Sequence, residues 1–211
     1  MKRQDIVKII KEEKIIAIVR LEEQWEVPIV LEKLIELNIK VLEITSNTPG
    51  FTEEISKARK CYANSNVLIG AGTVTNEKIA RKAIKAGAQF LVSPNTNIDV
   101  ITIAHQNEIP VLMGALTPTE ICTAVENGAD FIKLFPAGSF GLDYFKTIKA
   151  PLNNVDFFIV GGINLLNVED WMSAGASGVG LGSVLMEIVK SENSKETIEN
   201  TVKQFLKKIK E

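Results

Sequence analysis

Eight short apolar runs recur along this chain of 211 residues, and a segment with helical spacing separates each run from the next. Runs of this length bounded by glycine and proline are typical of strands buried on both faces. Strands that alternate with helices favour right-handed βαβ crossovers and a parallel sheet. Eight such units in one small chain predict an α/β fold, the (β/α)₈ or TIM barrel, rather than a doubly wound sheet. The runs are 15–20, 41–45, 67–73, 90–94, 111–116, 131–135, 157–162 and 178–183.

Two further helices are expected at the ends of the chain. An amphipathic segment at about residues 3–13 precedes the first strand, and apolar residues form one stripe along about residues 194–210. We expect a single barrel domain over 1–211, with the leading helix as an extra element. Thr75 and Thr117 are the expected N-caps of two inner helices. The glycines expected to close helices are Gly87, Gly128 and Gly175.

Charge and cysteine content narrow the class of protein. Lys and Arg number 24 against 26 Asp and Glu, with mixed signs and no basic block, so a nucleic-acid partner is not expected. Cys61 and Cys122 have neither metal-ligand spacing nor a disulfide framework, and we interpret both as reduced packing residues. No apolar run approaches the length of a membrane span, and the N-terminus leads directly into a helix. We expect a cytoplasmic protein with no membrane contact.

The sixth apolar run contains a lysine. Lys133 follows Phe131 and Ile132 and precedes Leu134 and Phe135. An ammonium group buried there is costly unless it is paired or neutral, and burial lowers a lysine pKa toward values at which the free amine is common. A free amine can form a Schiff base with a carbonyl. The alternative is a lysine at a strand end whose ammonium reaches water.

Glu43 is equally unusual, because it lies inside the second apolar run. Burial near the barrel mouth raises a carboxyl pKa and suits the group to proton transfer. A lysine with a carboxylate is the pair that imine chemistry on a keto acid requires, since a carbinolamine must lose water and an enamine carbon must gain or lose a proton. The alternative is that Glu43 is only an ion-pair partner for Lys133.

Glycines follow the last two strands. Gly161 and Gly162 end the seventh run, and Gly180, Gly182 and Ser183 end the eighth. This is the usual phosphate site of such barrels, where backbone N–H groups and helix N-termini bind the anion. The alternative is that these glycines only turn strand into loop. The polar residues expected at the strand ends are Arg20, Glu43, Thr45, Thr73, Ser93, Asn95, Thr117, Lys133 and Ser183, and they would converge on one pocket.

A metal or cofactor is not expected. His105, the one histidine, falls in a predicted helix away from the strand ends, where a surface or packing role is favoured. No cluster of His, Cys or Asp has metal-ligand spacing, which disfavours metal-dependent aldol chemistry.

The motifs together resemble the KDPG/KHG aldolases, which are class I pyruvate aldolases. Residues 128–141, with Lys133 at the centre, match the family's Schiff-base signature. Further matches lie at 43–45, 70–74, 93–94, 117–120, 161–163 and 182–183. The resemblance implies cleavage of 2-keto-3-deoxy-6-phosphogluconate (KDPG) to pyruvate and glyceraldehyde 3-phosphate, or cleavage of a related acid such as 4-hydroxy-2-oxoglutarate. It also implies a homotrimer.

The same resemblance implies roles for individual residues. Lys133 would be the Schiff-base nucleophile, Glu43 the general acid/base, and Thr73 a neighbour of the pyruvoyl carboxylate. Gly161, Gly162 and Ser183 would surround the phosphate. The substrate-binding residues expected in all are Arg20, Thr45, Asn47, Thr73, Ser93, Pro94, Phe135, Gly161, Gly162, Gly182 and Ser183.

Three departures from the family pattern concern the substrate rather than the reaction. Ser46 and Asn47 stand where the family has leucine or phenylalanine and then arginine, so a cation is missing. Met113 replaces a common proline, and Val160 replaces a common threonine. Arg20 matches an arginine of many relatives and could supply the missing charge.

Three functions remain open from the sequence. An aldolase is the first, a phosphosugar isomerase or synthase on the same barrel is the second, and a catalytically silent sugar-phosphate-binding protein is the third. A phosphate site alone would serve any of them, whereas a pyruvate adduct on lysine would identify the first.

Overall fold

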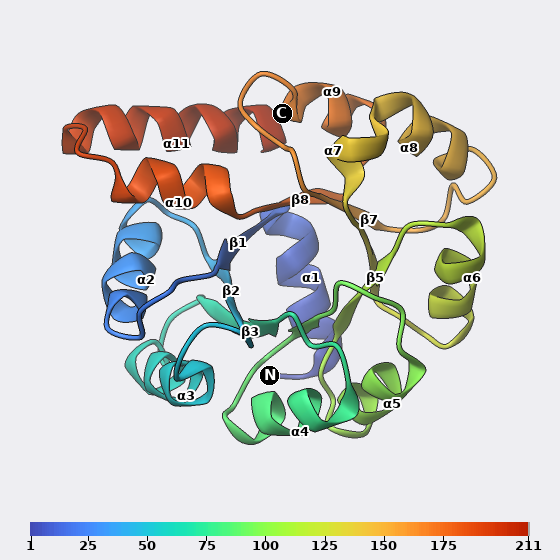
Figure 1. The fold of residues 1–211 in the computed structure, drawn as a ribbon, viewed down its shortest axis with the longest axis horizontal. Helices are drawn as coiled ribbons and strands as arrows, with labels where there is room; N and C mark the ends of the chain where they lie inside the picture. The colour runs from blue at the N-terminus through green and yellow to red at the C-terminus, as the bar shows by residue number, and fades with distance from the viewer. Residues whose placement is uncertain (211) are drawn as a thin grey trace.

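Eight parallel strands close into a barrel in the computed structural model, which describes residues 1–210 (Figure 1). Strands that follow one another in the chain pair with one another, and β8 pairs with β1 to close the sheet. The predicted (β/α)₈ barrel is therefore confirmed. The strands are β1 (Ile15–Val19), β2 (Val41–Thr45), β3 (Leu68–Gly72), β4 (Leu91–Val92), β5 (Val111–Ala115), β6 (Phe131–Leu134), β7 (Phe157–Val160) and β8 (Gly178–Leu181).

Helices surround the barrel in an outer ring, while α1 crosses one end of it (Figure 1). The leading and closing helices lie where the sequence predicted them, at α1 and α11. The helices are α1 (Arg3–Glu13), α2 (Glu26–Glu36), α3 (Phe51–Cys61), α4 (Glu77–Lys85), α5 (Ile98–Gln106), α6 (Pro118–Glu126), α7 (Ala137–Phe140), α8 (Leu142–Lys149), α9 (Val168–Ser173), α10 (Ser183–Lys190) and α11 (Lys195–Lys210).

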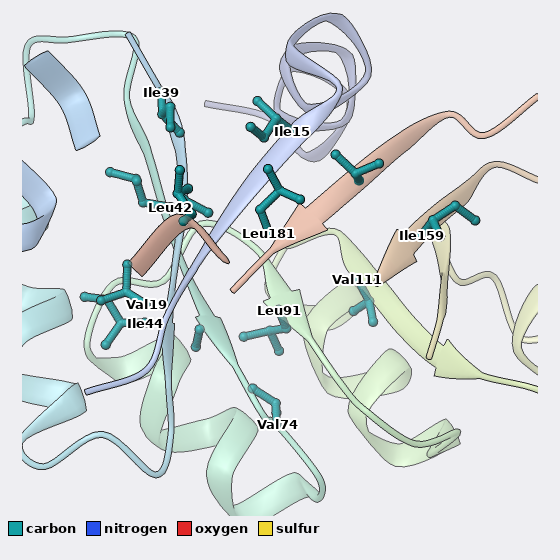
Figure 2. Close-up of a cluster of buried hydrophobic side chains, with 14 of the residues drawn as sticks. Ile15, Val19, Ile39, Leu42, Ile44, Val74, Leu91, Val111, Ile159 and Leu181 are labelled. Atoms are coloured by element: carbon teal, nitrogen blue, oxygen red, sulfur yellow. The ribbon is translucent and has the colours of Figure 1, made fainter. Parts of the chain in front are cut away.

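The core has two parts, because successive side chains of a strand point to opposite faces of the sheet. The larger part lies between the strands and the helices, and Figure 2 shows ten of its labelled side chains, including Ile15, Val19 and Leu42. The smaller part fills the barrel at the N-terminal ends of the strands, where Ile6 and Ile10 of α1 cover it. Apolar side chains thus close the barrel at the N-terminal ends of the strands, and a cavity lies at the C-terminal ends.

This alternation decides where the two unusual charged residues point. Phe131 belongs to the inner cluster, and Lys133 lies two residues further along the same strand. Val41 likewise belongs to the inner cluster, with Glu43 two residues beyond it. Both charged side chains therefore point into the barrel, one layer above its apolar base.

The helix ends agree with the sequence at most predicted positions. Thr117 caps α6 in a capping box with Glu120. The predicted N-cap at Thr75 was wrong by one residue. Asn76 caps α4, and its side chain accepts a hydrogen bond from the N–H of Ile79. Both residue types can cap a helix, and the helix begins one residue later than expected. The three predicted closing glycines, Gly87, Gly128 and Gly175, follow their helices with φ of 94°, 88° and 95°.

The two cysteines and the histidine lie on outer helices. Cys61 and Cys122 are free thiols on α3 and α6. Cys61 is exposed, so the packing role predicted for it was wrong, whereas Cys122 is partly buried. His105 lies on α5, where its Nε2 is 3.4 Å from Oδ2 of Asp130, just before β6. Among the described helices, none combines the length and the apolar character of a membrane span.

Candidate active site

A cavity of about 770 Å³ opens at the C-terminal ends of the strands, where barrel enzymes carry their active sites. Most of the residues predicted to bind substrate line it. They are Arg20, Thr73, Pro94, Phe135, Gly161, Gly162, Gly182 and Ser183. The predicted nucleophile Lys133 lines the cavity as well, whereas Glu43 is not among the lining residues.

Lys133 reaches this cavity from β6 and is only 5% exposed. Its Nζ lies 5.4 Å from the centroid of the Phe135 ring. Burial lowers the pKa of the Lys133 amine; the charge of Glu43 opposes this shift, and that of Arg20 adds to it. The amine is thus held toward its neutral, nucleophilic form.

Glu43 is 1% exposed on β2, and its Oε1 has no hydrogen-bond partner among the described residues. Burial raises the pKa of the Glu43 carboxyl, against the opposing charges of Lys133 and Arg20. An unpartnered buried oxygen is costly, and in a native protein it often marks a site of chemistry. The carboxyl is therefore placed to accept or release a proton.

Lys133 and Glu43 act on each other through charge without direct contact. Within residues 1–210, no ion pair or hydrogen bond joins the two side chains, although each shifts the pKa of the other. The ion-pair alternative for Glu43 therefore has no contact to support it. A substrate atom or a water molecule could bind between an amine and a carboxyl held apart in this way.

Arg20 and Thr73 form a second polar group in the cavity. Nη2 of Arg20 donates a hydrogen bond to Oγ1 of Thr73 over 3.2 Å. Thr73 has a φ of 56°, a left-handed conformation that costs about 1–3 kcal/mol for a residue other than glycine. Strained backbone of this kind clusters at functional sites. The guanidinium and the hydroxyl together suit a carboxylate.

The glycine loops after β7 and β8 also line the cavity. Gly161 and Gly162 have φ of 93° and 75°, values that glycine adopts readily. The N–H of Gly138 donates to the carbonyl of Gly161 over 2.8 Å, and a Cβ at Gly138 would lie 2.7 Å from that oxygen. The loop after the lysine strand is thereby joined to the loop after β7. Helix α10 begins at Ser183, so its free N–H groups face the same region.

Three of the predicted binding residues do not line the cavity, and neither do Asn95 and Thr117, which were also expected at this pocket. Thr45 is fully buried, and its hydroxyl is bonded to that of Thr48 at 3.0 Å. The hydroxyl of Ser93 donates to the backbone carbonyl of Asn95 at 2.7 Å. Asn47 is exposed on the loop after β2. A binding role for these three residues stays a prediction.

Other residues line the cavity that sequence reasoning did not identify. Ile18 comes from β1, while Met186, Glu187 and Lys190 come from α10. Glu187 and Lys190 lie four and seven residues after Ser183, so helical spacing places all three on one face. That spacing is the signal that could have identified them. Across the described chain, no group of three or more His, Cys, Asp or Glu side chains is arranged to hold a metal ion.

Comparisons with known proteins agree with this geometry. The family model for KDPG and KHG aldolase matches residues 6–200. A 2-dehydro-3-deoxy-6-phosphogalactonate aldolase from Escherichia coli strain K12 is 37% identical over 153 residues, which are 72% of this chain and 74% of the relative.

Two solved structures are similar over nearly the whole chain. One, described as native KDPGal, has a TM-score of 0.82 and 33% identity, and the match covers 92% of this chain and 93% of that one. The other is a KDPG aldolase from Legionella pneumophila with pyruvate captured as a covalent carbinolamine; it has a TM-score of 0.78 and 25% identity, with 97% and 96% covered. The resemblance seen in the motifs is confirmed, and the chain belongs to the KDPG and KHG aldolase family.

Proposed function

We propose that Lys133 is the Schiff-base residue of this aldolase and that Glu43 transfers the protons. The observation that carries the proposal is the position of the two groups in the barrel. A buried amine with a lowered pKa and a buried carboxyl with a raised pKa point into one interior from β6 and β2. Environments that drive the pKa values of two groups in opposite directions are typical of acid–base pairs.

The reaction follows from the chemistry of these two groups. The neutral amine of Lys133 adds to the ketone carbon of the substrate, and the carbinolamine loses water to give an iminium ion. Glu43 accepts the proton of the 4-hydroxyl group, directly or through water, as the bond between C3 and C4 breaks. The bonding electrons pass to the iminium nitrogen, which leaves an aldehyde and an enamine. Protonation of the enamine carbon and hydrolysis of the resulting imine release pyruvate and restore the lysine.

The rest of the cavity is proposed to bind the two anionic ends of the substrate. Arg20 and Thr73 would bind the carboxylate, because their hydrogen bond places a cation and a hydroxyl side by side. Gly161, Gly162 and the α10 N-terminus at Ser183 would bind a terminal phosphate through backbone N–H groups. The substrate class is therefore a phosphorylated 4-hydroxy-2-keto acid.

Within that class, the cavity wall favours a galactonate-type substrate over KDPG. Val160 lines the cavity just ahead of Gly161, where it offers methyl groups and no hydrogen-bond donor. The two sugar acids differ in the configuration of the 4-hydroxyl group, so a change in donors near the substrate chain can separate them. The Escherichia coli relative at 37% identity acts on the galactonate form according to its name, which supports this preference.

A pyruvate trapping experiment tests the proposal. Incubation with pyruvate and borohydride is expected to add one reduced pyruvate to Lys133, as mapped by peptide mass spectrometry. Lys133→Ala should abolish both labelling and cleavage. Glu43→Gln should still be labelled, while turnover falls about 10²–10⁴-fold, the usual scale of general acid–base catalysis.

Other outcomes would support the alternative functions. Label on another lysine would contradict the assignment of Lys133. No label at all would favour a phosphosugar isomerase, a synthase or a silent binding protein. Near-normal turnover in Glu43→Gln would show that Glu43 does not transfer the protons.

The assembly is proposed to be a homotrimer. Exposed apolar side chains include Trp25 and Ile29 at α2, and Val125 and Phe140 at α6 and α7, on different sides of the barrel (Figure 1). A ring with cyclic symmetry needs two such different patches, one for each neighbour. Light scattering should give three times the chain mass, and Trp25→Glu should lower it. A monomeric wild-type protein would contradict the proposal.

A further inference from the structure

Ser46 follows β2 directly, and both its backbone and its side chain bind the end of β3. Its N–H donates to the carbonyl of Gly72 over 2.8 Å. Its Oγ donates to the carbonyl of Thr73, also over 2.8 Å. The side-chain bond therefore falls on the residue with the left-handed backbone.

Thr73 needs such support more than most residues would. Its φ of 56° lies in a region that β-branched residues rarely adopt, because the side chain crowds the backbone there. A hydrogen bond to its carbonyl fixes the peptide plane on one side of the strained residue. The N–H of Val74, which belongs to the same peptide group, donates a hydrogen bond to the carbonyl of Val92 over 3.0 Å. The conformation is thus held by bonds to two neighbouring strand ends.

Thr73 in turn contacts Arg20 through its side chain. Oγ1 of Thr73 accepts the bond from Nη2 of Arg20 at 3.2 Å, and both residues line the cavity. Asn47 does not line it, although the family pattern has an arginine there. Of the two positions at which relatives carry an arginine, 20 and 47, only Arg20 lines the cavity, and it is bonded to Thr73.

We propose that Ser46 is a positioning residue for binding of the substrate carboxylate: it holds Thr73 in the left-handed conformation, and Thr73 holds Arg20. The leucine or phenylalanine of the family pattern could not donate this bond. The kinetic consequence rests on the proposed function, whereas the structural consequence does not.

Kinetics of Ser46 variants provide the first test. Ser46→Ala is expected to raise KM for the keto acid about tenfold, equivalent to about 1.4 kcal/mol. The value of kcat should change less than about twofold, because the chemical groups stay in place. Ser46→Thr keeps a hydroxyl donor and should restore most of the loss. Ser65→Ala is the matched control, since Ser65 makes the same kind of bond, to the carbonyl of Tyr62 at 2.8 Å, on an exposed loop.

A double-mutant cycle separates positioning from general stability. If Ser46 acts through Thr73 and Arg20, Ser46→Ala should add no further rise in KM to an Arg20→Ala enzyme. A rise of the same size in both backgrounds would overturn the proposal. An unchanged KM in the single variant would overturn it as well.

A crystal structure of Ser46→Ala is the test that does not depend on catalysis. Thr73 is expected to leave its positive φ, and its bond to Arg20 is expected to be lost. Retention of both features would overturn the proposal, whatever substrate the enzyme cleaves. Absence of a pyruvate adduct on wild-type Lys133 would instead overturn the proposed function, and the crystal structure would still decide the role of Ser46.

Discussion

The carboxyl group of Glu43 occupies the space that a side chain at Gly72 would fill. A Cβ at Gly72 would lie 1.6 Å from Oε1 of Glu43 and 2.3 Å from its Cδ. Gly72 ends β3, the strand that pairs with β2, so the missing side chain leaves room for the carboxyl in the barrel interior. Glycine is required at position 72 because of this close contact. Its backbone conformation is not the reason, since its φ lies outside the left-handed region.

The first prediction concerns this contact. Gly72→Ala should displace the Glu43 carboxyl and lower turnover by about 10²–10⁴-fold, which is the scale of losing a general acid–base. Labelling of Lys133 by pyruvate and borohydride should persist. Steady-state cleavage assays measure the loss, and circular dichroism checks that the barrel still folds. In a Glu43→Gln enzyme, Gly72→Ala should lower turnover no further; a full additional loss would show that Gly72 acts independently of Glu43.

The sequence pointed to the proposed reacting pair because each charge interrupts an apolar run. Lys133 and Glu43 each lie between two apolar residues, and strand periodicity alone points both side chains into the barrel. Strand order and the outer helices were predictable for a similar reason, since the period of the hydrophobic pattern changes between strand and helix.

The parts that could not be predicted lie in loops. The hydroxyl of Thr45 could face the cavity or a neighbouring loop, and the choice depends on Thr48, whose position is fixed by the folded loop. The same holds for Ser93 and Asn95. The positive φ of Thr73 could not be predicted from the residue type, because threonine rarely adopts this conformation.

The second prediction concerns the phosphate site. Gly162→Leu should lower the preference for a phosphorylated acceptor aldehyde by about 10–100-fold, because the side chain would crowd the loop that is proposed to donate N–H groups to the anion. Its Cβ would lie 3.1 Å from Cα of Gly138. Gly141→Leu is the matched control, since Gly141 also has a positive φ but has open space around it. The kcat/KM ratio for matched acceptors with and without phosphate measures the effect. If the kcat/KM ratio falls in both variants, backbone strain and not crowding of the loop would explain the effect.

The third prediction concerns substrate choice. Val160→Thr keeps the shape of the side chain and adds a hydroxyl donor beside the phosphate loop. One hydrogen bond contributes about 0.5–1.5 kcal/mol, so the kcat/KM ratio of KDPG to the galactonate form should rise about 2–13-fold. Val184→Thr adds the same group elsewhere on the cavity wall and should leave the ratio unchanged. A ratio unmoved by Val160→Thr would show that this wall does not discriminate.

The last prediction follows from the charge of Arg20. That charge lowers the pKa of Lys133 and also that of Glu43, so its removal should raise both. A higher Lys133 pKa leaves less free amine at a given pH, and the alkaline rise in the rate of pyruvate trapping should therefore move to higher pH in Arg20→Ala. KM for the keto acid should also increase, by about 10–150-fold if a charged hydrogen bond worth about 1.5–3 kcal/mol is lost. Arg81→Ala is the control, because Arg81 is a cation of α4 paired with Glu77 on the exposed surface. If the pH dependence of pyruvate trapping does not change while KM rises, Arg20 binds the substrate but does not alter the pKa of Lys133.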